Sequence, residues 1–218
     1  MTPQDRILDA ALRVFRRHGF RRSSIEQVAA AAGLTRQGLY HHFQSKEALF
    51  RAVIEALYDG ALAAEIAASD VAEKAGKSLA DILVSQVNAR LRHLIGSFDG
   101  SPHIEELFSE HLALGHDLYQ KYAKAYAGQI VATIERVRRR QRLVLAPGMD
   151  AGALARLIEM AMHGVKSIYP SMLPADDFLR EFDIMLRTLV AGSLVPSPRP
   201  ARAAATKTSS RKKSGDRR

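Results

Sequence analysis

The spacing of apolar residues constrains the fold of this chain more than any other feature of its sequence. Apolar side chains recur three and four positions apart, beginning with Ile7, Ala11 and Phe15, whereas the period-two alternation of a strand is never sustained. A spacing of three and four places side chains on one face of an α-helix. The sequence therefore predicts an all-α protein.

Capping residues divide this pattern into separate helices. Thr2 and Ser24 each open a capping-box pattern, and Gly19 and Gly33 mark helix stops. The helices predicted in this way span about 3–18, 24–33, 35–43, 45 into the sixties, 78–97, 102–114, 117–141, 150–168 and 175–192.

Charge and composition divide the chain into three parts. Residues 1–58 carry 9 basic and 5 acidic residues, and residues 59–195 carry 15 basic and 17 acidic residues. Residues 196–218 carry 8 basic residues and 1 acidic residue and have no large apolar side chain after Pro196, so they are predicted to be a disordered basic tail. Basic ends indicate a polyanionic partner, nucleic acid first and an anionic membrane second.

Several protein classes do not fit the composition. The chain has no cysteine, which excludes disulfides and thiolate zinc sites and agrees with a reducing cytoplasm. No run of about 18 apolar residues occurs, so no membrane span is expected. The N-terminus is polar from its first residues and lacks the apolar segment of a secretory signal.

Residues 24–43 predict a helix-turn-helix, in which two short helices are joined by the sequence AAGLT. Gly33 permits a positive φ in the connecting turn. Thr35 is the expected cap of the second helix, and Leu39 and Phe43 anchor that helix from beneath. The other side of the helix is left outward and rich in hydrogen-bond donors, as in helices that enter the DNA major groove.

Two segments of this region, AAGLTRQGLYHHF and SKEALF, resemble the TetR family of bacterial transcriptional regulators, and the resemblance covers residues 6 to about 58. It implies a three-helix DNA-binding domain over 1–58, a helical ligand-binding and dimerisation domain over 59–195, and a double-stranded operator as partner. Beyond residue 58 the likeness lies only in helical layout and length.

The resemblance also assigns roles to individual residues. Arg36, Gln37 and Gly38 fall where base edges are read, since arginine can pair with guanine and glutamine with adenine. Gly38 departs from the family's usual larger or hydroxylated residue. The residues that fall where family members meet the DNA backbone are Ser23, Ser24, Tyr40, His41 and Lys46, and Thr35 is also expected to bind DNA.

Each of these residues also has a plain structural interpretation. Ser24 can act as a helix cap alone, Tyr40 can cover the core with its ring, and arginines are often solvated surface charges. Arg16, Arg17, Arg21 and Arg22 are interpreted mostly as solvated charges that raise the local potential.

The remainder of the chain offers no catalytic motif. His103, His111 and His116 lie near acidic residues, but their spacing matches no metal-site motif, and no glycine-rich phosphate loop occurs. His111 shares a helical face with Leu107 and Phe108, which favours an interior histidine over a ligand to metal. We therefore expect no enzyme activity and no metal or other cofactor.

Two sets of side chains in the second domain are candidate binding surfaces. Tyr122 and Tyr126 continue an apolar helix face and, with Phe108 and His111, could line a small-molecule cavity, although core packing is the default interpretation. The resemblance implies a homodimeric four-helix interface formed by Leu154, Leu157, Ile158, Ala161, Phe178, Phe182, Met185 and Leu189.

Together these features predict a cytoplasmic repressor that binds a palindromic operator as a homodimer and is released by a small molecule, with no membrane partner. Two alternatives remain open at this stage. One is an effector-independent or architectural DNA-binding protein, which a filled second domain would favour. The other is an enzyme fused to a DNA-binding module, which would need convergent titratable groups.

Overall fold

Every helix predicted from the sequence is present in the computed structural model, which describes residues 2–195. This part of the chain is helical, and outside its helices it contains only one isolated bridge, between Leu145 and Leu194. The all-α prediction is therefore confirmed. The predicted basic tail, 196–218, lies outside the described residues.

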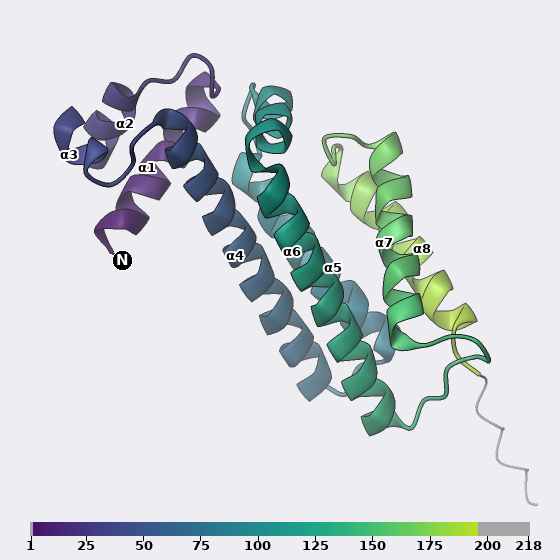
Figure 1. Ribbon diagram of the computed structural model, residues 1–218. Coiled ribbons are helices and arrows are strands. Elements are labelled where there is room, and N and C mark those ends of the chain that lie inside the picture. The colour runs from purple at the N-terminus through teal and green to yellow at the C-terminus, as the bar shows by residue number, and fades with distance from the viewer. Residues whose placement is uncertain (1, 196–218) are drawn as a thin grey trace, which may run out of the picture.

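Three short helices form the N-terminal end of the molecule: α1 (Pro3–His18), α2 (Ile25–Ala32) and α3 (Arg36–Tyr40) (Figure 1). Thr2 and Ser24 form the predicted capping boxes, in which each hydroxyl accepts the backbone N–H three residues later. The structure corrects the length predicted for the third helix, because α3 ends at Tyr40 and the chain turns through His41 and His42 before Phe43.

A long helix, α4 (Lys46–Lys74), leaves this end and extends along the rest of the molecule (Figure 1). Ser45 caps its first turn by accepting the backbone N–H of Ala48 at 3.0 Å. The helix continues beyond the sixties, and the predicted domain boundary at residue 58 falls inside it. One rigid element therefore contributes side chains to both halves of the chain.

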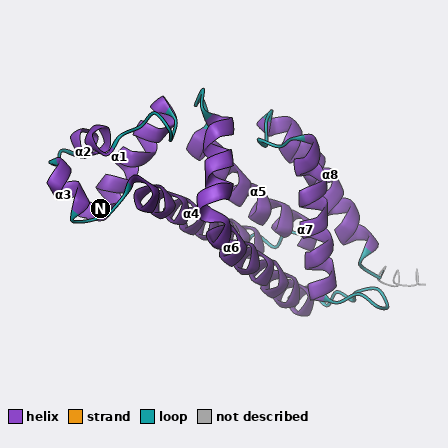
Figure 2. Cartoon of the chain, turned by 45° about the horizontal axis from the view of Figure 1, so that its top comes forward, coloured by secondary structure: helices purple, strands orange, loops and turns teal. Residues whose placement is uncertain are grey.

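Four further helices complete the described chain: α5 (Leu79–Phe98), α6 (Ile104–Gln141), α7 (Ala151–Ile168) and α8 (Ala175–Gly192). The break predicted near Gly115 is present as a kink in α6, where this glycine has the non-helical angles φ −125° and ψ 20°. In both ribbon views α7 and α8 lie at the end opposite α1–α3, and α4, α5 and α6 lie between them (Figures 1 and 2).

The buried apolar residues form two clusters rather than one. The first surrounds α1–α3 and the start of α4, with Phe15 packed edge-on against Phe50 at a ring separation of 5.3 Å. Leu107, Leu118 and Tyr122 of α6 belong to the same cluster. The second joins α5, the end of α6, α7 and α8. Because α6 contributes to both clusters, a displacement of this helix would affect both.

No helix within residues 2–195 has the length and apolar character that crossing a membrane requires.

Candidate functional site

The helix-turn-helix has its apolar residues inside and its polar residues outside. Gly33 ends α2 in the left-handed region, at φ 70° and ψ 31°, and so redirects the chain toward α3. Val28 and Leu39 are fully buried, and Phe43 is nearly so. Truncating a side chain buried in this way costs about 2–5 kcal/mol of folding free energy, so α3 is held firmly against α1 and α2.

The outward side of α3 carries the side chains predicted to meet DNA. Arg36, Gln37, Tyr40 and His41 are all exposed, as is the capping residue Thr35. The Arg36 guanidinium lies 2.8 Å from a carboxylate oxygen of Glu26 in α2 and 5.5 Å from the centre of the Tyr40 ring. Because both partners of this ion pair are exposed, the pair is weak enough for the arginine to exchange it for another acceptor.

Gly38 has a structural role at the cap of α3. Its N–H donates to Thr35 Oγ1 at 3.0 Å, and a Cβ atom at Gly38 would lie 3.2 Å from the same oxygen. A side chain at this position would require the Thr35 hydroxyl to shift by a few tenths of an ångström.

Two of the residues predicted to meet the DNA backbone, Ser23 and Lys46, also have hydrogen-bond partners within the protein. Ser23 is only 4% exposed, and its hydroxyl donates to the carbonyl of Gly19. The Lys46 ammonium donates to the carbonyls of Phe20 at 2.9 Å and Ser23 at 3.1 Å. Lys46 thus binds the turn before α2 and neutralises its free carbonyl groups. Ser24 is half-buried and acts as the cap of α2.

The same turn is held from its other side by α6. Glu106 accepts the backbone N–H of Arg21 at 2.7 Å, and Glu110 accepts from the Nε of Arg21 at 2.8 Å. Arg16 donates to the backbone carbonyl of Asp99, beyond the end of α5. Two of the basic residues predicted to be solvated therefore connect the helix-turn-helix to the rest of the chain.

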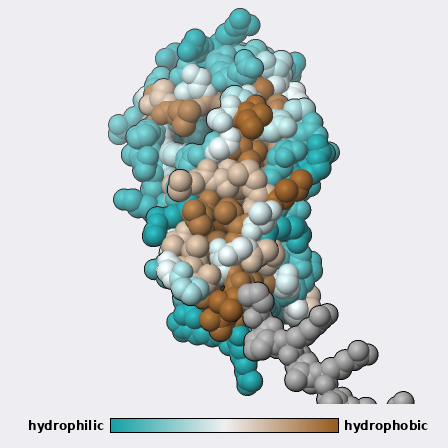
Figure 3. Space-filling view, turned by 90° about the vertical axis from the view of Figure 1, so that its right-hand side faces the viewer, coloured by the Kyte–Doolittle hydropathy of each residue, from teal (hydrophilic) through white to brown (hydrophobic). Residues whose placement is uncertain are grey.

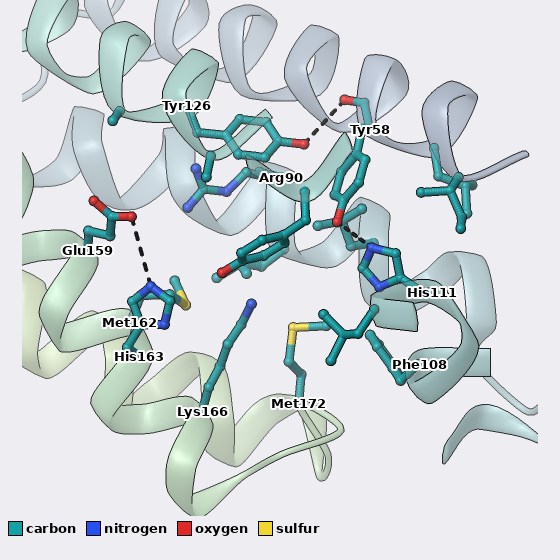
Figure 4. Close-up of a pocket in the computed structure, with 18 of the residues that line it drawn as sticks. Tyr58, Arg90, Phe108, His111, Tyr126, Glu159, Met162, His163, Lys166 and Met172 are labelled. Carbon is teal, nitrogen blue, oxygen red and sulfur yellow. Dashed lines mark hydrogen bonds and ion pairs between the residues drawn. The ribbon is translucent and has the colours of Figure 1, made fainter. Parts of the chain in front are cut away.

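A cavity of about 300 Å³ lies between α4, α5, α6 and α7 (Figure 4). Three of the four residues predicted to bind a ligand, Phe108, His111 and Tyr126, line it. The fourth, Tyr122, lies outside the lining, stacks on Tyr58 at 4.8 Å and donates its hydroxyl proton to Asp59. Volumes from about 300 Å³ upward are typical of small-molecule sites.

The cavity wall is mostly apolar, with a small number of polar groups. His111 Nε2 is hydrogen-bonded to the Tyr58 hydroxyl, and burial lowers the pKa of His111 to about 4, so the imidazole is neutral near pH 7. Arg90 lies 4.5 Å from the centre of the Tyr126 ring and forms an ion pair with the buried carboxylate of Glu65 at 3.2 Å. These polar groups therefore have partners from neighbouring helices.

The charged residues of the wall were not predicted from the sequence. Arg90 lies on α5, and Glu159, His163 and Lys166 lie on α7. The sequence contained one indication of these residues. Glu159, His163 and Lys166, together with Met162, are spaced three and four positions apart, as residues on one helix face are. Of these, Lys166 indicates a site most directly, because a charged group that loses part of its hydration is costly.

The residues predicted to form the dimer interface divide into two groups. Five of them are buried in the protomer's own core: Leu154, Ile158, Ala161, Phe178 and Phe182. The other three reach the surface, with Met185 exposed and Leu157 and Leu189 half-buried.

The outer face of α7 and α8 carries a different apolar set. Met160 is 68% exposed, Ile168 73% and Ile184 55%. Figure 3 shows this side of the molecule, with hydrophobic residues gathered down its middle and hydrophilic ones on both flanks. Large side chains exposed side by side in this way are typical of a surface that a partner covers.

Among residues 2–195, no three histidine, aspartate or glutamate side chains are grouped so that they could hold a metal ion.

Comparisons with known proteins agree with this architecture. Residues 7–53 match the family model described as bacterial regulatory proteins, tetR family. The HTH-type transcriptional regulator RutR of Escherichia coli K12 is 44% identical over 53 residues, which cover 24% of this chain and 25% of that protein. The chain therefore aligns with only about a quarter of the length of the curated relatives it matches.

Similarity to solved structures extends over most of the chain. The structure of SmeT, the repressor of the Stenotrophomonas maltophilia multidrug efflux pump SmeDEF, superposes with a TM-score of 0.60 at 22% identity and covers 90% of this chain and 97% of that one. The TetR family regulator PfmR of Thermus thermophilus gives a TM-score of 0.56 at 21% identity, covering 84% and 98%. Residues 7–53 thus match the TetR family of bacterial regulatory proteins, and the described chain has the fold of that family's solved members.

Proposed function

We propose that this chain is a transcriptional repressor that binds a palindromic operator as a homodimer and is released from it by a small molecule. The observation that carries the proposal is a helix-turn-helix with exposed Arg36, Gln37, Tyr40 and His41, joined by one continuous helix to a cavity of about 300 Å³. A protein of this kind acts in the cytoplasm, where its DNA lies.

In this proposal α3 lies in the major groove. Arg36 exchanges its ion pair with Glu26 for the O6 and N7 acceptors of guanine, and Gln37 pairs with adenine. Tyr40 and His41, one turn further along, contact phosphates and set the register. Glu26 keeps the guanidinium over the Tyr40 ring in the absence of DNA, which limits the side-chain entropy lost on binding.

Two copies of the chain associate through the outer faces of α7 and α8. Met160, Ile168 and Ile184 are the central contacts, and three surface residues already expected there from the sequence, Leu157, Met185 and Leu189, extend them. A two-fold axis pairs each patch with itself. The same axis presents two α3 helices to operator half-sites about 34–36 Å apart, one turn of DNA.

Release operates through the first part of α6. Phe108 and His111 line the cavity, and Glu106 and Glu110 on the same segment hold Arg21 in the turn before α2. The kink at Gly115 separates this segment from the remainder of the helix. A ligand that displaces Phe108 and His111 therefore moves the turn. The DNA-binding free energy lost equals the difference between the ligand's binding free energies for the displaced and the original arrangement.

The function is tested by selecting bound fragments from a pool of random duplex DNA with the full chain. We expect enrichment of a palindrome, and loss of one base preference per half-site for Arg36→Ala. The matched control is Arg13→Ala, which removes an equally exposed arginine that is paired with Asp9 on α1. Recovery of fragments without any common sequence would contradict the proposal.

The release mechanism has its own test. Glu110→Gln should leave ligand affinity unchanged and reduce the effect of the ligand on DNA affinity, because it breaks the ion pair with Arg21 without touching the cavity. Glu105→Gln, on the exposed side of the same segment, is the control. If both variants respond to ligand as the wild type does, the signal does not pass through this ion pair.

A further inference from the structure

One charge in the cavity is left without a counter-charge. Lys166, on the inward face of α7, extends its ammonium group into the cavity below Arg90 and between His163 and Met172 (Figure 4). It forms no ion pair with any residue of the described range 2–195, and no hydrogen bond from its Nζ to these residues is present. We propose that the cavity binds an apolar monocarboxylate whose carboxylate pairs with Lys166.

The other charges around the cavity are already balanced. Arg90 is paired with Glu65, which also accepts a hydrogen bond from Gln86 at 2.7 Å. Glu159 lies 3.8 Å from His163 in a pair that is about half exposed, at the outer edge of α7. Because Arg90 is paired within the protein and the half-exposed Glu159 is reached by water, a ligand that enters the cavity meets a single uncompensated cation.

The surroundings of Lys166 make this cation costly. Apolar side chains from four helices and from the loop after α7 line the same cavity, among them Leu91, Phe108, Ile130, Met162 and the loop residue Met172. An isolated ammonium group loses hydration in such surroundings, and burial together with the nearby Arg90 lowers the pKa of Lys166 to about 8. It is still mostly protonated at pH 7, so an anion that replaces its lost hydration gains both the ion pair and the hydrogen bonds.

The ligand class follows from the number and position of the charges. A single cation within an apolar wall suits one carboxylate attached to an apolar body. A phosphate ester or a nucleotide would bring two or more negative charges, and only Lys166 is free to neutralise them. A neutral apolar compound would leave the ammonium uncompensated. This inference rests on the proposed effector function for its biological meaning, but the binding step can be measured without DNA.

The test is calorimetric titration of the full chain with sodium decanoate and with 1-decanol, which has the same chain length and no charge. We expect the wild type to bind decanoate at least about tenfold more tightly than decanol. Lys166→Met, which keeps the unbranched side chain up to the position of Cε and removes the ammonium group, should remove that preference by weakening decanoate and leaving decanol nearly unchanged. Lys166→Arg should retain it.

The control is Lys124→Met, which removes the same charge from the exposed side of α6, outside the cavity. Lys166→Met should melt at or above the wild-type temperature, because it removes an unpaired cation, so loss of binding cannot be attributed to unfolding. Equal affinity of wild type and Lys166→Met for decanoate would overturn the proposal. A wild type without preference for decanoate, including one that binds neither probe, would also overturn it.

The outcomes separate this inference from the proposed function. Decanoate binding that depends on Lys166 but leaves DNA affinity unchanged would contradict the proposed effector-controlled function and leave the inference standing. Release of DNA by decanol as effective as release by decanoate would support that function and contradict the inference.

Discussion

The two ends of the molecule distribute their polar and apolar residues in opposite ways. Around α1–α3 the apolar side chains are inside, and Arg36, Gln37 and Tyr40 are outside. Around α7 the interior contains Lys166, whereas Met160 and Ile168 are exposed. Buried charges and exposed large apolar groups are the informative exceptions in a soluble protein. This difference supports the proposal that the N-terminal end meets a polar partner on its surface, whereas the other end meets a ligand inside and a second chain outside.

The largest effect expected from this comparison is on the outer apolar face. Met160→Glu and Ile184→Glu each place a charge in the proposed interface while leaving the core intact, since both side chains are more than half exposed. We expect folded monomers that no longer bind the operator at concentrations at which the wild type is saturated, because a buried unpaired charge opposes association. Light scattering and DNA titration measure the two effects.

The buried neighbour Leu154 provides the contrast for this experiment. It is fully buried in the protomer, so Leu154→Glu should unfold the chain rather than divide a dimer. Circular dichroism distinguishes these outcomes. If the Met160→Glu and Ile184→Glu variants are dimeric and bind DNA normally, the outer face of α7 and α8 is not the dimer interface.

The second expected effect concerns the polar surface of α3. Arg36→Ala should weaken binding to the selected operator by about 1–3 kcal/mol and affect random DNA much less, because a base contact is lost rather than a phosphate contact. Fluorescence anisotropy on both duplexes measures the difference. If both duplexes lose affinity to the same extent, Arg36 serves only to attract the phosphate backbone.

A third, smaller effect follows from the charge inside the cavity. The lowered pKa of Lys166, about 8, means that its cation is present below this pH and is lost above it. Decanoate affinity should therefore fall about tenfold between pH 7 and pH 9, and decanol affinity should not. The other titratable groups facing the cavity are Tyr58, Arg90, His111, Tyr119, Tyr126, Glu159 and His163.

These neighbours do not produce the same pH dependence. Burial raises the pKa of Tyr58 and Tyr126 and lowers that of His111 to about 4, so none of these three changes charge between pH 7 and pH 9. The matched measurement on Lys166→Met should give a flat profile. A profile for this variant as steep as that of the wild type would assign the titration to another group.

The smallest effect is expected from the basic tail, residues 196–218, which lies outside the described residues. Its 8 basic residues and 1 acidic residue can pair with phosphates without reading bases. Deleting it should reduce affinity for operator and random DNA by a similar factor and flatten the dependence of log affinity on log salt. Identical salt slopes for the full and shortened chains would show that the tail makes no phosphate contact.

The sequence predicts the N-terminal end more completely than the other because its signals are local. Thr2, Ser24 and Thr35 cap the helices that follow them, and the turn at Gly33 is fixed by one backbone conformation. The contacts of Ser23 and Lys46 with the turn at 19–23 could not be predicted in this way, because spacing within a helix does not reveal them.

The helices of the second half illustrate what apolar spacing cannot determine. α7 carries one apolar face with Leu154 and Ile158, which is buried, and another with Met160 and Ile168, which is exposed. Periodicity identifies both faces but not the neighbour that covers each of them, because that depends on how α5, α6 and α8 pack. For the same reason the position of Lys166 inside a cavity could be recognised only from the tertiary structure.

The most direct measurement for the proposed coupling of ligand and DNA is the affinity of the full chain for its selected operator at increasing concentrations of decanoate. We expect DNA affinity to fall and then to reach a plateau. The total factor by which DNA affinity falls equals the ratio of the ligand's affinities for the DNA-free and the DNA-bound protein. Lys166→Met should need at least about tenfold more decanoate to reach the same plateau. Constant DNA affinity at decanoate concentrations that saturate the cavity by calorimetry would contradict this coupling.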